Sequence, residues 1–572
     1  MSIDIETYRL KAQEAIEYVF VKEYHNSLGI PMPIVKMLLP DDANYSTGQY
    51  YITIDKTWQI HLNFGKLPIS YHEFQNEVKV LTRHEIEHYM CCPFDVITHF
   101  RMLKRIRDVY YKHFSHLGIN IEYACGAISN QAADIIVDTK NYYRHSKETL
   151  KSEIDWIKIG ANISACPRHC KLMFLTKEAI WKEDLGINET DPEFLKIVHQ
   201  LADSFTKNGI EDKSSFLDKV EEYAEIFFKL YVEDQKNPQQ SSQQGSQQQN
   251  GQQGSQQQSG QQGPQQQSGQ WGVGRPKDGD EHGNAFVFAD PDKVKEAIEV
   301  LAEETSVEEF IDLLAIAGII GMSDKQKGVL WFNVQSANII PIVEFSNTGN
   351  KSSYTYPSVW RIGDPIEELD LMLTYMTSPR LIPGMTTKKW GYVSNDDNGT
   401  ESKQMDLLLV VDTSGSMGSA MKESANMHQA VLASYGILSY FESTKSKVAF
   451  IGFSDKIDAY VDWSDKYDDV RERLLTNGHG GTKFPISRIK STLDVRSRDL
   501  VTVLITNGDL GNINESVSYF RDYLNDDNKL YIFLLGGSKS LHSYEPLKNI
   551  GAKIYNANNA NEFCDMVLTD ME

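Results

Sequence analysis

The sequence predicts a multidomain protein in which a mainly helical α+β part with a small sheet precedes an α/β part with a mostly parallel sheet. Three observations predict this fold class. The chain of 572 residues is too long for a single hydrophobic core. Apolar residues at helical spacing dominate residues 1–233. Across residues 401–572, near-continuous apolar strands alternate with helices, which is typical of a sheet covered on both faces.

Composition argues against two classes of partner. The formal net charge is −22, from 79 acidic and 57 basic residues, and no basic cluster stands out, so we expect no nucleic-acid surface. The start, MSIDIETYRL, is acidic and polar rather than basic and then apolar, and the longest apolar run, residues 313–321, is too short to span a membrane. The six cysteines lack a disulfide-like spacing and favour a reducing, cytoplasmic location.

Residues 1–233 are expected to form the first domain. The two strands expected there, residues 50–54 and 59–64, are predicted to form a hairpin, since a short run separates them and both are rich in β-forming residues. In chain order, the pattern predicts a helix at residues 5–24, strands at 50–54 and 59–64, a helix from Tyr71, and helices at 98–114, 121–143 and 219–231.

The helix from Tyr71 carries the pattern H-E-x-x-H at His84, Glu85 and His88. Residues four apart lie on one face of a helix, so both imidazoles can reach one ion. Zinc takes neutral imidazole ligands and keeps a position for water in catalytic sites, where Glu85 could act as the general base. A structural pair of histidines is the alternative. Glu87 is expected on the solvent side of the helix.

A third ligand is expected on the helix at residues 121–143. Asp134 and Asp138 are four residues apart, and their apolar neighbours indicate that this helix is too buried for two idle carboxylates. Either acid would complete three protein ligands and leave a position for water. A solvated helix face that carries both acids is the alternative.

A single C-x-x-x-C, Cys166 to Cys170 with His169 inside it, invites a second metal interpretation. A structural zinc site needs a second pair of ligands, and this run lacks one. We therefore expect free thiols there.

Residues 234–275 are expected to be a flexible linker, because the composition collapses into Gln, Ser and Gly. Residues 276–400 form an expected adaptor region in which no pattern indicates a chemistry. It contains predicted helices at residues 294–303 and 307–319 and then an aromatic, loop-rich stretch with Trp331, Tyr354, Tyr356, Trp360 and Trp390.

Residues 401–572 are expected to form the last domain, with ligands at the carboxyl ends of its strands. At the end of its first strand stands D-x-S-x-S, formed by Asp412, Ser414 and Ser416. One carboxylate and two hydroxyls suit Mg²⁺; a helix N-cap turn is the alternative. The expected strands are residues 405–412, 448–453, 457–463, 500–506, 530–535 and 553–555, and the expected helices are 420–441, 465–475, 514–524, 545–550 and 560–568.

Two segments of the first domain, RHEIEHYMCCPFD and NQAADIIVD, resemble bacterial metallopeptidase domains of the zincin-like kind that precede a von Willebrand factor A (VWA) domain. The resemblance implies zinc bound by His84, His88 and Asp134, with Glu85 as the base. Asp138 stands where this family is expected to have Asn, so the choice between the two aspartates stays open.

The D-x-S-x-S signature resembles the metal-ion-dependent adhesion site (MIDAS) of VWA domains, which binds magnesium. Thr482 matches the loop threonine of that family. Asn507 stands where the family usually has Asp, so one charge is missing, and Asp509 could compensate from two residues further on.

Similar VWA proteins act beside MoxR-type AAA+ ATPases, so the resemblance implies such an ATPase as the partner. The leading hypothesis is a cytoplasmic zinc-dependent peptidase that hydrolyses polypeptides and recruits a protein partner through Mg²⁺ on its VWA domain. The alternative is a non-enzymatic VWA scaffold or co-chaperone of the ATPase with a structural or vestigial metal site. A third hypothesis is insertion of a cofactor metal into another enzyme, as in chelatase-like systems.

Overall fold

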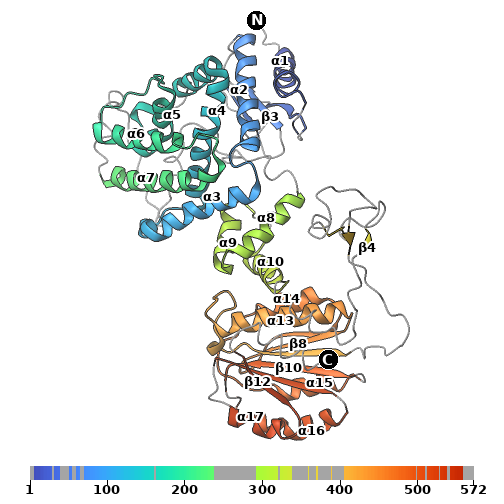
Figure 1. Ribbon diagram of the computed structural model, residues 1–572. Helices are drawn as coiled ribbons and strands as arrows, with labels where there is room; N and C mark the ends of the chain where they lie inside the picture. Colours follow the sequence, from blue (N-terminus) through green and yellow to red (C-terminus); the bar gives the residue numbers. More distant parts are fainter. Residues whose placement is uncertain are drawn as a thin grey trace, which may run out of the picture. The chain divides into compact units, whose positions relative to one another are not determined.

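The computed structural model of the chain divides into two compact units (Figure 1). Unit 1 comprises Met1–Glu304 and Asp312–Gly321, and unit 2 comprises Thr305–Ile311 and Met322–Glu572. The structure describes residues 5–26, 28, 31–38, 50–54, 59–64, 70–159, 163–236, 291–319, 322–337, 358–359, 369–370, 388–389, 405–496, 499–508, 510, 512–526, 528–536 and 541–557.

Unit 1 is mostly helical, with a three-stranded sheet near its start and several short 3₁₀ or π turns (η). Its last helix in sequence, α8, is followed by α9 (Val307–Ile316), whose residues are divided between the two units. The elements are α1 (Ile5–Tyr18), η1 (Val19–Glu23), β1 (Ile34–Leu38), β2 (Tyr50–Ile54), β3 (Gln59–Phe64), α2 (Tyr71–Met90), α3 (Val96–Val109), η2 (Tyr110–Phe114), η3 (Ser115–Leu117), α4 (Ile121–Ile159), η4 (Ile163–Ala165), α5 (Arg168–Trp181), α6 (Pro192–Thr206), η5 (Lys213–Ser215), α7 (Phe216–Lys236) and α8 (Pro291–Glu304).

The small sheet of unit 1 has the order β1-β3-β2. β2 and β3 pair antiparallel at the predicted bounds, which confirms the hairpin, while β1 was not predicted and pairs parallel to β3. Ile60 and Leu62 of β3 pack against Ile16 of α1 and against Phe74 and Val78 of α2 in one buried cluster. The sheet therefore supports the helix that carries H-E-x-x-H.

The helices α2 and α4 pack side by side (Figure 1). α2 begins with a capping box, in which the Ser70 hydroxyl accepts the Glu73 N–H and the Glu73 carboxylate accepts the Ser70 N–H. α4 consists of two helical segments that meet at a kink at His145, where the backbone angles are not helical. The predicted end at residue 143 lies close to this kink, and the second segment continues to Ile159. This pairing places H-E-x-x-H opposite the two aspartates of α4.

Two buried charged residues of α2, Arg83 and Glu87, link this helix to neighbouring segments. Arg83, only 3% exposed, donates to both carboxylate oxygens of Glu23 at 2.8 and 2.6 Å and also to Glu148 of α4. A buried guanidinium needs such partners, because an unpaired charge in the interior is strongly unfavourable. Register between α2 and α4 is therefore set by charge as well as by packing.

Glu87 is fully buried, so the expectation that it faces solvent is wrong. Its carboxylate lies 2.9 Å from Lys140 Nζ and 2.8 Å from Arg144 Nη1, both on α4, and accepts the hydroxyl of Tyr24 at 3.0 Å. The cations that neutralise it come from a helix more than fifty residues away in sequence, which helical spacing alone does not reveal.

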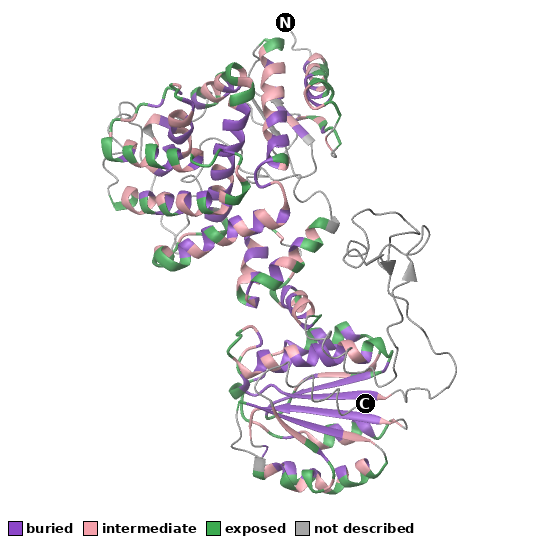
Figure 2. Ribbon diagram, in the orientation of Figure 1, coloured by how far each residue is buried: buried purple, intermediate pink, exposed green. Residues whose placement is uncertain are grey.

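Unit 2 contains a six-stranded sheet covered by helices on both faces (Figures 1 and 2). Its elements are α10 (Asp324–Ala337), β4 (Ser358–Val359), β5 (Leu369–Asp370), β6 (Lys388–Lys389), β7 (Asp406–Asp412), η7 (Gly415–Met417), α13 (Asn426–Ser443), β8 (Val448–Phe453), β9 (Ile457–Ser464), α14 (Tyr467–Leu474), α15 (Ile486–Leu493), β10 (Leu500–Thr506), η8 (Ile513–Ser516), α16 (Val517–Asn525), β11 (Lys529–Leu535), α17 (Leu541–Lys548) and β12 (Lys553–Ala557).

The six-stranded sheet has the order β12-β11-β10-β7-β8-β9, and each pairing is parallel except that of β8 with β9. The prediction of a mostly parallel sheet is confirmed. α13 and α14 cover one face, and α15, α16 and α17 cover the other (Figure 1). β7 and β10 are buried along their whole length, which agrees with their continuous apolar sequences (Figure 2).

Several sequence predictions for residues 234–400 fall on α7, α8, α9 and α10 or beyond the described residues. α7 extends three residues past the expected domain end at 233. Residues 237–290, which include most of the linker expected at 234–275, lie outside the described residues. The loop-rich character expected around Trp331 is wrong, because Trp331 lies in the helix α10. There it is buried and donates to the Thr305 carbonyl at 2.9 Å. Tyr354, Tyr356, Trp360 and Trp390 of the aromatic stretch, and the helix expected at 560–568, also lie outside the described residues.

Within the described ranges, none of the helices combines the length and the apolar character that crossing a bilayer requires.

Substitution Glu87→Ala is expected to lower the free energy of unfolding of unit 1 by about 3–5 kcal/mol, because Lys140 and Arg144 lose a buried counter-charge. The measurement is the shift of the unfolding transition in scanning calorimetry of the full chain. Glu85→Ala, on the same helix but without an ion pair among the described residues, serves as the control and should cost less than about 1 kcal/mol. Equal shifts in the two variants would contradict the prediction.

Candidate functional site

Two imidazoles and one carboxylate converge between α2 and α4. His84 Nε2 and His88 Nε2 lie 3.0 Å apart, and Asp134 Oδ1 lies 3.5 Å from the first and 3.3 Å from the second. We call His84, His88 and Asp134 the metal cluster, since these three residues are placed to hold a metal ion. It is the one group of three or more His, Cys, Asp or Glu side chains with that arrangement among the described residues.

The other nitrogen of each imidazole is held by a fixed acceptor. His84 Nδ1–H donates to Asp138 Oδ1 at 2.6 Å, and His88 Nδ1–H donates to the Cys92 carbonyl at 2.8 Å. A neutral imidazole that donates from Nδ1 has its lone pair on Nε2. Both lone pairs therefore point at the same place, which is the usual orientation of metal-binding histidines.

Asp134 and Asp138 have different roles, which the sequence left open. Asp134 Oδ2 accepts a hydrogen bond from Asn130 Nδ2 at 3.0 Å, whereas its buried Oδ1 accepts none among the described residues. A buried carboxylate oxygen without a hydrogen bond is costly unless a cation binds it. Asp138 uses both oxygens, one on His84 and one on Lys177 Nζ at 2.5 Å. Asp134 is thus the third candidate ligand, and Asp138 orients His84.

The electrostatics of the metal cluster favour a cation. Burial alone would lower the pKa of His84, but the adjacent Asp138 carboxylate, with a smaller effect from Asp134, raises that pKa to about 9. Burial would raise the pKa of the Asp134 carboxyl, yet its contacts with His88 and His84 hold that pKa below its usual value. In the metal-free chain, a proton on His84 therefore offsets part of the negative charge of the nearby carboxylates. A bound metal ion would replace this proton as the positive charge.

Glu85 differs from the other acids near the metal cluster in its surroundings. It is 8% exposed, and no hydrogen bond or ion pair joins its carboxylate to the described residues. Its charge contributes to the raised pKa of His84, so it lies close to the metal cluster. Glu87, two residues on, is held by two cations, whereas no such partner contacts Glu85 among the described residues.

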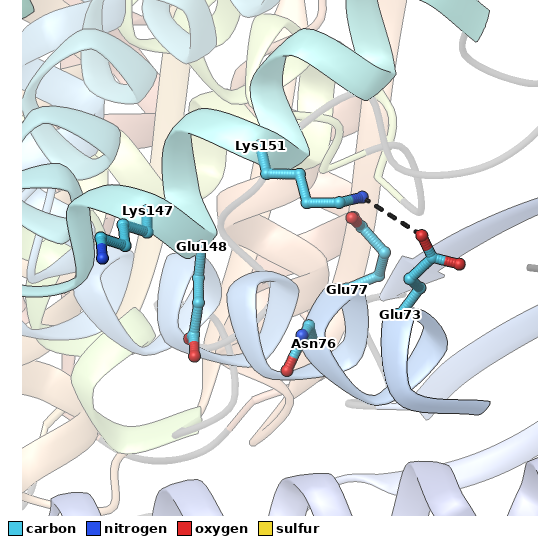
Figure 3. A pocket seen from close by; sticks show the side chains of 6 residues that line it. All are labelled: Glu73, Asn76, Glu77, Lys147, Glu148 and Lys151. Atoms are coloured by element: carbon cyan, nitrogen blue, oxygen red, sulfur yellow. Dashed lines mark ion pairs between the residues drawn. The ribbon is translucent and has the colours of Figure 1, made fainter. Parts of the chain in front are cut away.

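A separate pocket of about 180 Å³ lies further toward the start of α2 (Figure 3). Figure 3 shows Lys151 reaching from α4 toward Glu73 of α2, with Glu77 beside this pair. None of the residues that line it belongs to the metal cluster. They are Glu73, Asn76, Glu77, Lys147, Glu148 and Lys151.

The C-x-x-x-C run does not join the metal cluster. His169 instead places Nδ1 2.8 Å from Asp234 Oδ2, and neither Cys166 nor Cys170 forms a disulfide among the described residues. Burial raises the pKa of Cys170 to about 12 and that of Cys91 to about 11. The expectation of free thiols in this run stays a prediction.

The D-x-S-x-S residues meet Asn507 at the carboxyl ends of β7 and β10. Ser414 Oγ and Ser416 Oγ are 3.1 Å apart, and Ser416 Oγ donates to Asn507 Oδ1 at 3.1 Å. The amide returns a bond, since Asn507 Nδ2 donates to the Ser416 carbonyl at 2.9 Å. We call Asp412, Ser414, Ser416 and Asn507 the D-x-S-x-S group. It presents hard oxygen donors from two adjacent strands.

Asp412 is fully buried beneath this group. Its Oδ1 accepts the Ser414 N–H at 2.9 Å and its Oδ2 accepts the Thr506 hydroxyl at 2.6 Å. Thr482 is half-buried on the neighbouring loop, whose Gly480 carbonyl accepts the Gly415 N–H at 3.3 Å, but no hydrogen bond joins Thr482 to the group in the described part of the chain. Asp509 lies outside the described residues.

Sequence reasoning missed three polar contributors. Thr506 immediately precedes Asn507, and a hydroxyl at the end of a strand beside D-x-S-x-S was a usable signal. The Cys92 carbonyl follows His88 by four residues, but no side-chain pattern marks a backbone acceptor. Lys177 comes from a different helix, α5, and the sequence offers no signal that links it to Asp138.

Comparison with known proteins adds no family. No family model matches the chain, and no curated protein matches it. The geometry of the two groups therefore carries the functional conclusion.

Metal affinity of the metal cluster is expected to rise with pH. His84, with a pKa of about 9 in the metal-free chain, is protonated at neutral pH, so an incoming ion must displace one proton. Between pH 6 and 8 the apparent Kd for zinc should fall about tenfold per pH unit and should level off at higher pH. Competition with a chromophoric chelator measures it; an affinity independent of pH in that range would contradict the prediction.

Substitution Asn507→Asp is expected to strengthen Mg²⁺ or Mn²⁺ binding at the D-x-S-x-S group by about tenfold or more, because it adds a second carboxylate to a group that has one carboxylate, Asp412, and two neutral hydroxyls. Isothermal titration calorimetry of the full chain measures the change. Asp412→Asn, which removes the existing carboxylate, is the control and should weaken binding. Unchanged affinity in Asn507→Asp would show that this side chain is not part of a cation site.

Proposed function

We propose that the chain is a zinc-dependent peptidase with Glu85 as its general base. The observation that carries this proposal is the convergence of two Nε2 atoms and Asp134 Oδ1 beside the buried Glu85. Among the described residues, neither Asp134 Oδ1 nor the Glu85 carboxylate has a hydrogen-bond partner. A catalytic zinc site needs three protein ligands, a position for water and a nearby carboxylate. The cluster with Glu85 provides the ligands and the carboxylate.

The spacing of the ligand atoms supports zinc. The three atoms are separated by 3.0, 3.3 and 3.5 Å. Tetrahedral ligands about 2.0–2.1 Å from zinc lie about 3.3 Å from one another. Two imidazoles with one carboxylate also form a ligand set that zinc commonly accepts.

In the proposed reaction, bound zinc would lower the pKa of a water molecule and polarise a peptide carbonyl. Asp138 and the Cys92 carbonyl hold the imidazoles in the tautomer that directs Nε2 inward. Glu85 accepts the proton of the attacking water on its carboxylate and passes it to the departing amine nitrogen. Among the described residues no cation pairs with this carboxylate, which leaves it available for both transfers.

The setting proposed for this reaction is the reducing cytosol. The five cysteines in the described ranges are all free thiols, as a reducing compartment would maintain them. A chain of net charge −22 also supports polypeptide rather than nucleic acid as the substrate class.

For the D-x-S-x-S group we propose Mg²⁺ binding and, through the ion, capture of a carboxylate on a protein partner. The two serine hydroxyls are 3.1 Å apart, compared with about 3 Å for neighbouring ligands in an octahedral shell with bonds of about 2.1 Å. A MoxR-type AAA+ ATPase is the partner that the resemblance to VWA proteins implies. It would deliver or remodel the polypeptide that the first unit cleaves.

A second candidate is a non-enzymatic scaffold or co-chaperone of that ATPase with a structural metal. It is favoured by the burial of the metal cluster, whose side chains are 13% (His84), 1% (His88) and 7% (Asp134) exposed. Structural zinc sites are closed, whereas catalytic sites keep access for substrate. Glu85 separates the two candidates, because a structural site has no use for it.

Substitution Glu85→Gln is expected to reduce hydrolysis of fluorescein-labelled casein by about 10²–10⁴-fold while zinc stays near one per chain, because the general base is lost and the ligands remain. Release of fluorescent peptides and elemental analysis of the same preparations give the two readouts. Glu73→Gln, on the same helix and remote from the cluster, is the matched control. Zinc-loaded wild-type protein without hydrolysis of any tested polypeptide would favour the scaffold.

A further inference from the structure

Lys177 is a buried cation behind the metal cluster. It comes from α5, which packs beside α4, and is 2% exposed. Its Nζ lies 2.5 Å from Asp138 Oδ2 and 2.9 Å from Glu153 Oε1. Burying an ammonium group is costly even when it is paired, so a lysine in this position calls for a reason beyond packing.

The contacts form a chain that ends at the metal cluster. Glu153 contacts Lys177, Lys177 contacts Asp138, and Asp138 accepts Nδ1–H of His84 at 2.6 Å. Each oxygen of Asp138 has one partner, so the carboxylate cannot rotate without breaking a charged hydrogen bond. The orientation of the His84 ring is therefore fixed from α5 through α4.

The two histidines of the cluster differ in this respect. His88 Nδ1–H donates to a backbone carbonyl, that of Cys92, whose position α2 and its C-terminal turn determine. His84 depends on a side chain, and that side chain depends on Lys177. Without the ammonium group, Asp138 would lose its second anchor and face the like charge of Glu153.

We propose that Lys177 is a positioning residue for the metal cluster: it holds Asp138 in the orientation that directs His84 Nε2 to the ion. The proposal rests on the metal site of the proposed function. Its distinguishing claim is that Lys177 acts on metal binding only through Asp138.

A matched control lies on the same helix. Lys171 is also buried, at 8% exposure, and its Nζ lies 2.9 Å from Glu189 Oε2. That pair has no contact with Asp138 or His84 among the described residues. A purely structural role for buried lysines of α5 would make the two positions equivalent in their effect on metal binding.

The experiment measures Kd for Zn²⁺ and Co²⁺ in the full chain by competition with a chromophoric chelator, together with the visible absorption spectrum of bound Co²⁺. Lys177→Met is expected to weaken binding by about 10–100-fold, the usual effect of losing a partner behind a metal ligand, and to alter the Co²⁺ spectrum. Lys171→Met should leave both unchanged. Thermal unfolding of the metal-free variants monitors folding.

A double-mutant cycle tests the claim that Lys177 acts through Asp138. Asp138→Asn with Lys177→Met should bind metal as Asp138→Asn alone does; an additional loss of tenfold or more in the double variant would overturn the proposal. This comparison also serves if Lys177→Met alone does not fold, because the double variant leaves no unpaired charge at Asp138. Wild-type affinity in Lys177→Met would overturn this proposal alone, whereas a wild-type chain that binds neither metal would overturn the proposed zinc site as well.

Discussion

The side-by-side packing of α2 and α4 is the constraint on which the metal cluster depends. Each helix alone carries only part of the ligand set. The three ligand atoms lie 3.0, 3.3 and 3.5 Å from one another, and this convergence requires a fixed distance and register between the two helices. Apolar packing supplies the distance. Register comes from buried charges that reach across the contact, namely Arg83 with Glu148 and Glu87 with Lys140 and Arg144. The packing of α2 against α4 is thus held by ion pairs with buried members, as is Asp138 at the metal cluster.

The acids of these two helices are distinguished by what neutralises them. Glu87 has two cations, and Asp138 has Lys177 and the Nδ1–H of His84. Asp134 has an amide on one oxygen and an open second oxygen, and Glu85 has no partner among the described residues. A carboxylate that is already neutralised is a poor ligand and a poor base. The pairing pattern therefore separates structural acids from those available for chemistry.

Much of the fold could be predicted from sequence, because period-two and period-3.6 patterns translate directly into strands and helices. The buried strands of the six-stranded sheet, such as Val448–Phe453 and Leu500–Thr506, have the predicted bounds. β1 was missed because two prolines, Pro31 and Pro33, precede a strand of five residues. α15, which has eight residues and follows Pro485, was also missed, although α14, of the same length, was predicted.

At the site, spacing along one helix predicted which side chains share a face but not what they face. His84, His88 and an aspartate of α4 were found, whereas the choice of Asp134 over Asp138 depends on which oxygen already has a partner. Glu87 was placed wrongly and Lys177 was missed for the same reason: their partners come from other helices. Contacts between distant segments are set by tertiary packing, and a single sequence does not encode them in any local pattern.

The two hydrogen bonds between Asn507 and Ser416 also bear on how long the amide survives. Asn507 is followed by Gly508, and an asparagine before glycine loses ammonia most readily, because a residue without a side chain leaves its backbone nitrogen free to attack the amide carbon. Holding the amide on both sides slows that reaction. Where it proceeds, hydrolysis leaves an acid in place of the amide. The charge of the D-x-S-x-S group would then depend on the age of the molecule as well as on its gene.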